Sequence, residues 1–382
     1  MNKPIYLDYA ATTPVDPRVA DKLMQYLTMD GVFANPASRS HMYGWQAEAA
    51  VEHARKQVAG LLNADTREIV WTSGATESNN LAIKGVAAAR KQQGRHIITS
   101  LAEHKAVIDC VAYLEQQGFE VTWLKPRVSG EIAVDDVKQA IRPDTILISL
   151  MHVNNETGAI TNVAEIAKVA KAENIIFHID AAQSAGKLDL DTQILQADLI
   201  SMCAHKIYGP KGVGALYVRR RDDFVLPAQI QGGGHERGMR SGTLPTHQIA
   251  AMGEAFEIAG ACRIDEQARI SKLKSMFMEK ISGLKGVKVN GQFGQGVSGI
   301  LNLSFSGLDG QLLLSALPSL AISSGSACTS ATMSPSHVLK SMGVDDTAAL
   351  SSLRFSFGRY TTDEDVLKAA DMLINAVQKM SA

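Results

Sequence analysis

The sequence predicts an α/β fold in which a large domain with a mainly parallel, seven-stranded sheet is joined to a smaller α+β domain. The length of 382 residues exceeds what one simple core usually holds and suits two domains. Hydrophobic residues make up 46% of the chain and charged residues 20%, as in globular α/β proteins. From about residue 68 to 218, short apolar runs alternate with helical patterns, which is typical of a parallel sheet covered by helices.

The strands expected in this region are short apolar runs at residues 68–72, 96–99, 121–124, 145–151, 175–180, 199–203 and 214–218. Helical patterns lie between several of them, at residues 78–92, 106–117, 134–141 and 163–172. In sheets of this kind, ligands bind at the carboxyl ends of the strands. The residues that directly follow each strand are therefore the first candidates for function.

The chain changes character after about residue 262. A helix is expected at 265–284, strands at 299–305 and 321–323, and a last helix at 362–379. We therefore expect a large domain over residues 15–261, and a small domain formed by residues 1–14 and 262–382. A helix at 17–29 follows the N-terminal segment, which is expected to lie at a domain interface.

Charge and cysteine content limit the classes of protein to which this chain can belong. The net charge is −1, with 38 basic and 39 acidic residues, which gives no electrostatic reason to expect direct binding to nucleic acid or to a membrane. The N-terminus lacks the apolar run of a signal peptide, so a cytoplasmic location is expected. The four cysteines include no CxxC pair, and scattered thiols predict neither a zinc site nor a disulfide framework.

Lys206 directly follows His205 after the apolar run at 199–203, and Gly/Pro-containing loop residues come next. A lysine at a strand end can lie in a pocket, where loss of hydration lowers the pKa of its amine. A neutral amine can form a Schiff base with an aldehyde. The alternative is an ordinary surface lysine, which is the better interpretation while Lys206 is taken alone.

Asp180 ends the very apolar run at 175–179 and would share one edge of the sheet with Lys206. A carboxylate there needs a partner, and a protonated pyridine nitrogen is a suitable one. That ion pair keeps the pyridinium charged, which is what makes pyridoxal phosphate an electron sink. The alternative is an aspartate that caps the following turn.

Residues 74–79 follow the first strand and open a helix. Gly74 and Ala75 are small enough to let the backbone approach a ligand, and a helix N-terminus with the Thr76 hydroxyl suits a phosphate. The alternative is a simple helix cap, with Thr76 as the N-cap residue and Asn79 three positions later. Together with Asp180 and Lys206, a phosphate cup would complete a pyridoxal-phosphate site.

Three polar residues follow other strands of the sheet. His104 could stack on a flat ring and exchange protons near neutral pH, or be a partly exposed loop histidine. Asn155 and Gln183 could bond a ring hydroxyl, or stabilise turns.

Cys328 and Arg354 lie far from these residues in the chain. Cys328 stands in a run of small residues at 323–332, which predicts a mobile, exposed segment and a plausible nucleophile. Cys110 and Cys262 lie in helical patterns and are expected to fill space in the core. Arg354 lies in an alternating apolar strand and needs a carboxylate, either that of a substrate or an internal Asp or Glu.

Taken together, these residues resemble the class V aminotransferase-like pyridoxal-phosphate enzymes, and more narrowly the cysteine desulfurases of the housekeeping iron–sulfur assembly type. The resemblance covers essentially the whole chain and is strongest at residues 6–14, 72–78, 151–156, 205–212, 232–243 and 323–330. It implies the aspartate-aminotransferase-like fold of pyridoxal-phosphate transferases. The large domain would hold the cofactor, and the small domain would carry the catalytic cysteine.

The resemblance also implies a role for each site residue. Lys206 would bind the cofactor aldehyde and move the substrate Cα proton, Asp180 would pair with the pyridinium, and His104 would stack on the ring. Asn155 and Gln183 would bond the ring hydroxyl, and Arg354 with Asn155 would hold the substrate carboxylate. The phosphate would be held by Ala75, Thr76, Cys203 and His205. Thr243 would reach the phosphate of a neighbouring subunit, so that the active unit is a homodimer.

The implied reaction removes sulfur from L-cysteine, leaving L-alanine and a persulfide on Cys328. The sulfur would pass to an iron–sulfur scaffold protein and to carriers for tRNA thiolation. No metal of its own is expected, although Cys328 would transiently share a cluster with the scaffold.

This sequence departs from the resemblance at two points. Position 203 is usually serine in close relatives, and Cys203 is a weaker hydrogen-bond donor. Relatives of this type also continue past the position of Ala382 into a tail that helps to dock the scaffold, so the chain is expected either to be truncated or to bind the scaffold differently.

Other functions compete with this one. A selenocysteine lyase or an aminotransferase would share the fold and cofactor, although a transaminase would not need Cys328. A non-catalytic sulfur carrier or regulatory subunit would not need to keep Lys206, Asp180 and Cys328 together. A binding protein without cofactor would require the whole set to be coincidental.

Overall fold

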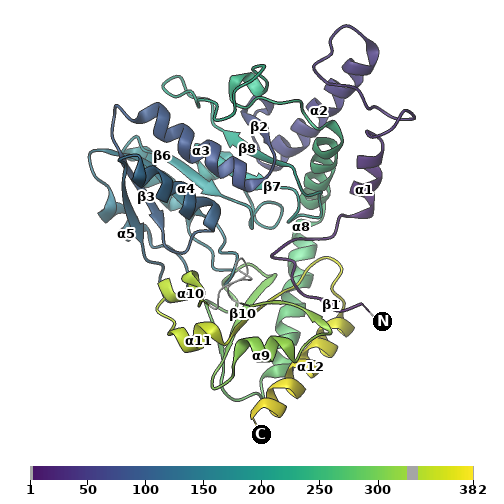
Figure 1. Ribbon diagram of the computed structural model, residues 1–382, viewed down its shortest axis with the longest axis vertical. Helices are drawn as coiled ribbons and strands as arrows, with labels where there is room; N and C mark the ends of the chain where they lie inside the picture. Colours follow the sequence, from purple (N-terminus) through teal and green to yellow (C-terminus); the bar gives the residue numbers. More distant parts are fainter. Residues whose placement is uncertain (1–2, 325–333, 382) are drawn as a thin grey trace.

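The computed structural model describes residues 3–324 and 334–381, which form a large and a small lobe (Figure 1). The large lobe is built on a seven-stranded sheet with the order β2-β8-β7-β6-β5-β3-β4. Its strands are β2 (Ile69–Thr72), β3 (His96–Ser100), β4 (Glu120–Leu124), β5 (Thr145–Met151), β6 (Ile176–Asp180), β7 (Leu199–Cys203) and β8 (Gly214–Val218). Only β8 runs antiparallel to its neighbours in this sheet of the described chain. The predicted α/β class and the mainly parallel seven-stranded sheet are confirmed.

Helices cover both faces of this sheet. The helices α3 (Ala75–Arg90) and α4 (Lys105–Gln116) lie on one face, visible in front of the strands in Figure 1, and share a core with the sheet. On the other face, α2 (Met42–Leu61), α6 (Val163–Ala172) and the first half of α8 (Thr246–Ile281) pack in a second core. Shorter helices complete the lobe, namely α1 (Pro17–Met24), α5 (Val134–Ala140) and α7 (Thr192–Leu195).

The small lobe is an α+β unit, as predicted. Its four-stranded sheet has the order β12-β13-β10-β9, made of β9 (Val287–Val289), β10 (Ile300–Phe305), β12 (Ser323–Ser324) and β13 (Ser352–Ser356). The second half of α8, α9 (Gly310–Ser315) and α12 (Asp363–Ser381) pack against it, and α10 (His337–Ser341) and α11 (Asp346–Leu350) lie beside it. The N-terminal strand β1 (Ile5–Tyr6) pairs in parallel with β11 (Leu320–Ala321), so the start of the chain belongs to this lobe.

Two helices differ from the sequence prediction by more than a few residues. The helix expected at 265–284 is the second half of the longer α8, whose first half is rich in Ala and Gly because it packs very closely on α2. A Cβ at Gly253 would lie 2.6 Å from the Cα of Ala54. The helix expected at 17–29 ends at Met24, where the chain folds back and the N–H of Val32 donates to the carbonyl of Gln25.

α8 joins the two lobes. Buried residues of its first half, such as Ile249 and Phe256, belong to the large core, whereas Ile270 and Phe277 belong to the small core. We propose that the division expected at residues 261 and 262 falls at this change of core, inside a continuous helix.

None of the helices in the described part of the chain combines the length and the hydrophobicity needed to cross a bilayer. Residues 3–324 and 334–381 also contain no group of three or more His, Cys, Asp or Glu side chains arranged to hold a metal ion.

A buried ion pair anchors the segment before α8 to the large sheet. The Arg55 guanidinium donates to both carboxylate oxygens of Glu236, at 2.8 and 2.9 Å, and to the carbonyl of Ile69. Glu236 also accepts from the backbone N–H of Trp71 at 2.8 Å. Glu236 and the next residue, Arg237, adopt left-handed backbone angles (φ 48° and 56°), so these bonds hold the chain in an uncommon conformation.

We predict that Glu236→Gln lowers the free energy of unfolding by about 3–5 kcal/mol, because it removes the buried counterion of Arg55. The matched control is Glu52→Gln, which removes an exposed partner of the same guanidinium and should cost less than about 1 kcal/mol. Urea denaturation followed by circular dichroism measures both changes. Equal losses in the two variants would contradict the assignment.

Candidate active site

A cavity of about 500 Å³ lies at the carboxyl ends of β3, β5, β6 and β7. Its wall includes nine of the residues singled out in the sequence, namely Ala75, Thr76, His104, Asn155, Asp180, Gln183, Cys203, His205 and Lys206. Ala11 and Thr12 also line it; they lie in the stretch 6–14, where the resemblance is strong, but no role is expected for either of them. The parallel strands thus bring together side chains that are far apart in the chain.

The N-terminus of α3 opens into this cavity. Gly74 is the N-cap residue (φ 152°), and no side chain among the described residues caps it. A Cβ at Gly74 would meet no described atom within 4 Å, so the backbone is accessible to a ligand. Thr76 lies inside the helix, and the alternative of Thr76 as N-cap is therefore wrong. Free N–H groups at a helix start favour an anion.

Asp180 caps the turn that follows it, which is one of the two interpretations that the sequence left open, and its pairing with a pyridinium nitrogen stays a prediction. Its Oδ1 accepts from the backbone N–H of Ala182 at 2.9 Å, as a turn cap does, and its Oδ2 accepts from Asn79 Nδ2 at 2.8 Å. The Asn79 amide therefore fixes the plane of the carboxylate at the cavity wall. Sequence reasoning missed this role, although the place of Asn79 one turn into α3, facing the sheet, was a usable signal.

Lys206 is half-buried in the cavity wall and is not the freely exposed surface lysine of the alternative interpretation. A second lysine, Lys187, lies nearby, and burial together with the Lys206 charge lowers the pKa of Lys187 to about 8. Lys187 donates to Gln183 Oε1 at 3.0 Å, and Gln183 Nε2 donates to the carbonyl of Ala10 at 2.7 Å. These two bonds fix which way the Gln183 amide faces.

His104 is half-buried and is the N-cap residue of α4, where its Nδ1 accepts from the N–H of Ala106 at 3.1 Å. The neutral ring then carries its proton on Nε2. Burial, and secondly the Lys206 charge, lower the pKa of His104. The preceding Glu103 is almost fully buried and accepts from the N–H of Met151, and burial raises the pKa of its carboxyl well above the usual range. Sequence reasoning did not single out Glu103.

Cys203 and His205 flank the end of β7. Burial raises the pKa of the Cys203 thiol, so it stays protonated near neutral pH. The ring of His205 lies 3.2 Å from Thr12 Oγ1, and burial next to Lys206 lowers the pKa of His205 to about 4. Both residues are therefore uncharged at pH 7.

Three predicted site residues are not among the described residues that line the cavity. Arg354 is buried and donates to Asp8 Oδ1 and to the carbonyl of Asn155, each at 2.9 Å, so an internal carboxylate is its partner in this structure. Thr243 is exposed. Cys328 lies outside the described residues. The roles expected for these three residues stay predictions.

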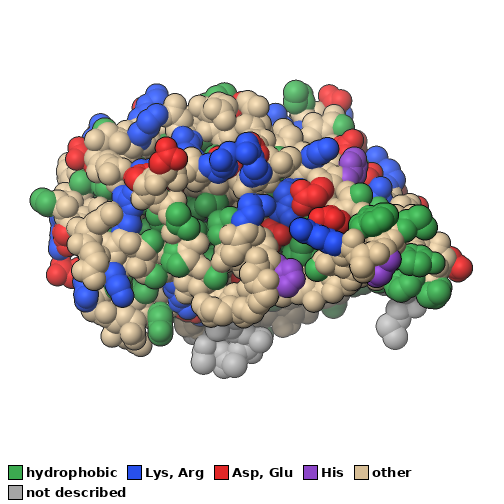
Figure 2. Space-filling model, turned by 90° about the horizontal axis from the view of Figure 1, so that it is seen from above, with side chains coloured by type: hydrophobic (Ala, Val, Ile, Leu, Met, Phe, Trp, Pro, Cys, Tyr) green, Lys and Arg blue, Asp and Glu red, His purple; other side chains and the backbone are tan. Residues whose placement is uncertain are grey.

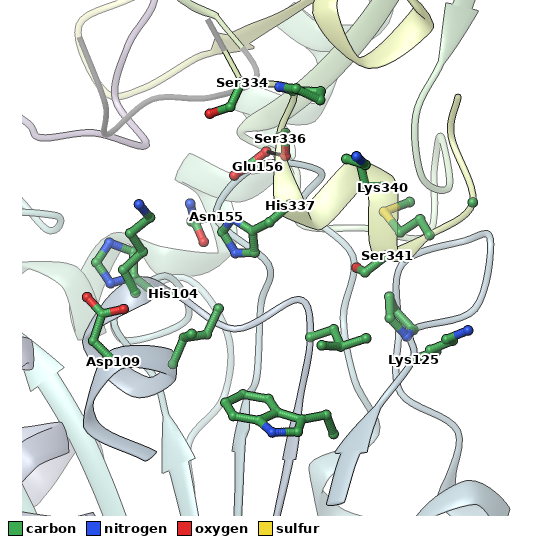
Figure 3. A pocket seen from close by; sticks show the side chains of 18 residues that line it. His104, Asp109, Lys125, Asn155, Glu156, Ser334, Ser336, His337, Lys340 and Ser341 are labelled. Carbon is green, nitrogen blue, oxygen red and sulfur yellow. Dashed lines mark hydrogen bonds between the residues drawn. The ribbon is translucent and has the colours of Figure 1, made fainter. Parts of the chain in front are cut away.

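A second, larger cavity of about 930 Å³ adjoins the first (Figure 3). His104 and Asn155 line both cavities. Apolar side chains, including Leu101, Ile108 and Trp123, form much of its wall, and Ser334 to Gly343 of the small lobe close its other side.

Comparison with known proteins identifies the family. The profile described as aminotransferase class V matches residues 5–368. The chain belongs to the class V aminotransferase family. It is 58% identical to cysteine desulfurase IscS of Shewanella oneidensis over 380 residues, which are 100% of this chain and 94% of that protein. It is 56% identical to cysteine desulfurase IscS of Vibrio cholerae serotype O1, with coverage of 100% and 95%.

Solved structures agree with this assignment. A NifS-like protein superposes with a TM-score of 0.90 at 33% identity, covering 99% of both chains. SspA in complex with cysteine superposes with a TM-score of 0.83 at 39% identity, covering 94% of this chain and 99% of that one. The resemblance drawn from the sequence, to class V enzymes and to the housekeeping cysteine desulfurases within them, is confirmed, as is pyridoxal phosphate as the cofactor.

The residues of the cavity fit pyridoxal phosphate. The uncapped start of α3 suits the phosphate, Asp180 suits the pyridinium nitrogen, and the Lys206 amine suits the aldehyde. Asn155 Oδ1 is buried without a hydrogen-bond partner among the described residues, which indicates that the amide serves a group outside the protein chain.

We predict that Cys203→Ser lowers the dissociation constant of pyridoxal phosphate by about fivefold, because a hydroxyl is a better donor to the phosphate than a thiol and one such bond contributes about 1 kcal/mol. Absorbance titration of the apoprotein with pyridoxal phosphate measures the constant. Cys262→Ser, which changes a thiol outside the cavity wall, is the control. An unchanged dissociation constant in Cys203→Ser would show that position 203 does not contact the phosphate.

Proposed function

We propose that this chain is a pyridoxal-phosphate-dependent cysteine desulfurase that supplies sulfur for iron–sulfur cluster assembly. The main support is the cavity that gathers Lys206, Asp180 and the start of α3 in a chain that also holds Cys328. Full-length identity of 56–58% to cysteine desulfurase IscS proteins supports the same reaction. The relative SspA, solved in complex with cysteine, supports L-cysteine as the substrate.

Each of the main residues of the cavity has a separate role in the proposed reaction. Pyridoxal phosphate, when bound, supplies an electron sink for the bond between Cα and its hydrogen. Lys206 takes that proton with its Nζ. Asp180, whose carboxylate is held by Asn79, provides a negative charge for the pyridinium nitrogen of the cofactor. His104 and Asn155 both line the cavity, and we propose that Arg354 and Asn155 receive the substrate carboxylate.

Cys328 carries the sulfur step in this proposal. Its thiolate attacks the sulfur of the substrate, an S–S bond forms and the Cβ–S bond of the substrate breaks. The electron pair of the broken bond stays with Cβ, which is then protonated, and Lys206 returns a proton to Cα to give L-alanine. Cys328 is left as a persulfide, whose outer sulfur can be passed to an acceptor such as a scaffold protein. Carriers for tRNA thiolation are proposed as further acceptors.

The homodimer is part of the same proposal. Exposed apolar side chains gather in and around the segment between α1 and α2, namely Met24, Leu27, Met29, Phe33, Met42, Tyr43 and Trp45. Figure 2 shows hydrophobic side chains clustered at the right-hand edge, the side on which α1 and α2 lie in Figure 1. Apolar patches of this kind mark interaction surfaces. A second copy on this surface would also give the exposed Thr243 the partner site that the family resemblance assigns to it.

The direct test of the function is to incubate the holoenzyme with L-cysteine and then measure the mass of the peptide that contains Cys328. We expect the mass to rise by one sulfur atom and L-alanine to appear. We expect Cys328→Ala to abolish alanine formation while keeping the visible band of the cofactor, and Lys206→Ala to remove that band. Turnover of L-cysteine with an unmodified Cys328 would contradict the proposal. Release of a keto acid would indicate a transaminase.

Sedimentation velocity tests the homodimer. We expect the wild-type protein to sediment as a dimer of 41.0 kDa chains, and the double variant Met29→Asp/Phe33→Asp to dissociate because buried charges destabilise an apolar interface. Leu312→Asp, an equally exposed apolar position on α9 of the small lobe, is the control and should remain dimeric. A double variant that sediments like the wild type would place the interface elsewhere.

A further inference from the structure

Glu156 is a buried carboxylate with no part in the reaction described above. It lies in the loop that follows β5, directly after Asn155, and is 6% exposed. Asn154 fixes this loop, because its Oδ1 accepts from the N–H groups of Glu156 and Thr157, and its Nδ2 donates to the carbonyl of Ala102 at 3.0 Å. The backbone of Glu156 is therefore held firmly within the large lobe.

The side chain of Glu156 crosses to the small lobe, where the Ser336 hydroxyl donates to its Oε2 at 2.5 Å (Figure 3). Ser336 is 3% exposed and is the N-cap residue of α10, so its oxygen also accepts from the N–H of Leu339 at 3.2 Å. A hydroxyl has one hydrogen to give, and here Glu156 receives it. The two buried side chains thus form a specific bridge between the lobes.

A second link reaches the same loop from Ser323, at the start of β12. The Ser323 hydroxyl donates to Asp8 Oδ1 at 2.9 Å and accepts from Arg354 Nη2 at 3.2 Å. Arg354 Nη1 in turn donates to the carbonyl of Asn155 at 2.9 Å. Ser323 is therefore joined through Arg354 to the residue that precedes Glu156.

The stretch of chain between Ser323 and Ser336 contains Cys328. Both of its ends are tied to adjacent residues, Asn155 and Glu156, and Asn155 also lines the cofactor cavity. We propose that Glu156 is a positioning residue for sulfur transfer, which acts by holding Ser336, beyond the C-terminal end of the Cys328-bearing stretch, in a fixed place relative to the cofactor site. This inference rests on the proposed role of Cys328 as sulfur acceptor.

A carboxylate suits this task better than most side chains. A hydroxyl bonded to an ionised oxygen makes a shorter and stronger bond than one bonded to a neutral group. Burial raises the pKa of Glu156 to about 7, while the Ser336 hydrogen bond and the Arg354 charge oppose that rise. A glutamine in this place would still offer an oxygen to Ser336, so Glu156→Gln is a conservative variant, whereas Glu156→Ala removes the acceptor.

Two measurements separate positioning of Cys328 from chemistry at the cofactor. Exchange of the L-alanine Cα hydrogen in D₂O, followed by NMR, reports the proton step of Lys206 and does not require Cys328. Persulfide formation, whose single-turnover rate is followed by mass spectrometry, requires both the proton step of Lys206 and Cys328. We expect Glu156→Ala to slow persulfide formation by about tenfold or more, the effect of one lost hydrogen bond to a charged group, with little change in exchange.

Variants at both ends of the bridge sharpen the test. Glu156→Gln should restore most of the persulfide rate. Ser336→Gly should slow it as Glu156→Ala does, because glycine keeps most of the helix-cap stability while losing the hydroxyl. The double variant Glu156→Ala/Ser336→Gly should form the persulfide no more slowly than either single variant, as expected for two ends of one interaction. Ser341→Ala is the control, since that hydroxyl lines the same cavity but donates to Val338 within its own helix.

The inference is overturned if Glu156→Ala forms the persulfide at the wild-type rate, or if exchange and persulfide formation slow equally, which would indicate a general loss of structure. If Glu156→Ala does not fold, the persulfide rates of Ser336→Gly and Ser341→Ala are compared instead. Equal rates in these two variants would overturn the inference. A wild-type protein that forms no persulfide on Cys328 refutes the proposed function itself, an outcome distinct from an unaffected variant.

Discussion

The structure depends on a buried guanidinium at the meeting point of the two lobes. Arg354 stands in the small sheet and is 2% exposed, so its charge has to be compensated within the protein. Its bonds to Asp8, to Ser323 and to the carbonyl of Asn155 join the N-terminal segment, the small sheet and the wall of the cofactor cavity. This side chain therefore links the two lobes to each other and to the cavity, in addition to the continuous α8 and the bridge between Glu156 and Ser336. Nε of Arg354 has no partner among the described residues and remains available as a donor.

Burial also determines which groups of the site carry charge. His205 and Cys203 are uncharged near pH 7 because burial disfavours their ionised forms, and burial raises the pKa of the Glu103 carboxyl for the same reason. Lys187 titrates near pH 8, so this second amine is close to losing its charge under ordinary conditions. The cavity thus surrounds the Asp180 carboxylate and the Lys206 amine with polar groups that are mostly neutral. A few unscreened charges act more strongly in such a setting than they would in water.

The fold and most of the cavity could be predicted from the sequence because both follow from local patterns. Strands such as Thr145–Met151 and Leu199–Cys203 are uninterrupted apolar runs with polar residues at their ends, and parallel topology brings those ends together. Asn79 and Glu103 were missed because their roles arise from contacts across the sheet that no local pattern records. The first half of α8 was missed because helices packed closely on both sides lose the polar face that reveals a helix in the sequence. The sequence pattern also fits Thr76 as a cap because threonine is among the favoured N-cap residues, whereas here Gly74 takes the position.

The continuous α8 has a mechanical consequence. With 36 residues at 1.5 Å each it is about 54 Å long, and each half is embedded in a different core. Bending such a rod at its middle by about 4° would displace its far end by about 2 Å, as a lever does. A small change of curvature in this one helix would then move residues of the small core relative to the large core by a similar distance.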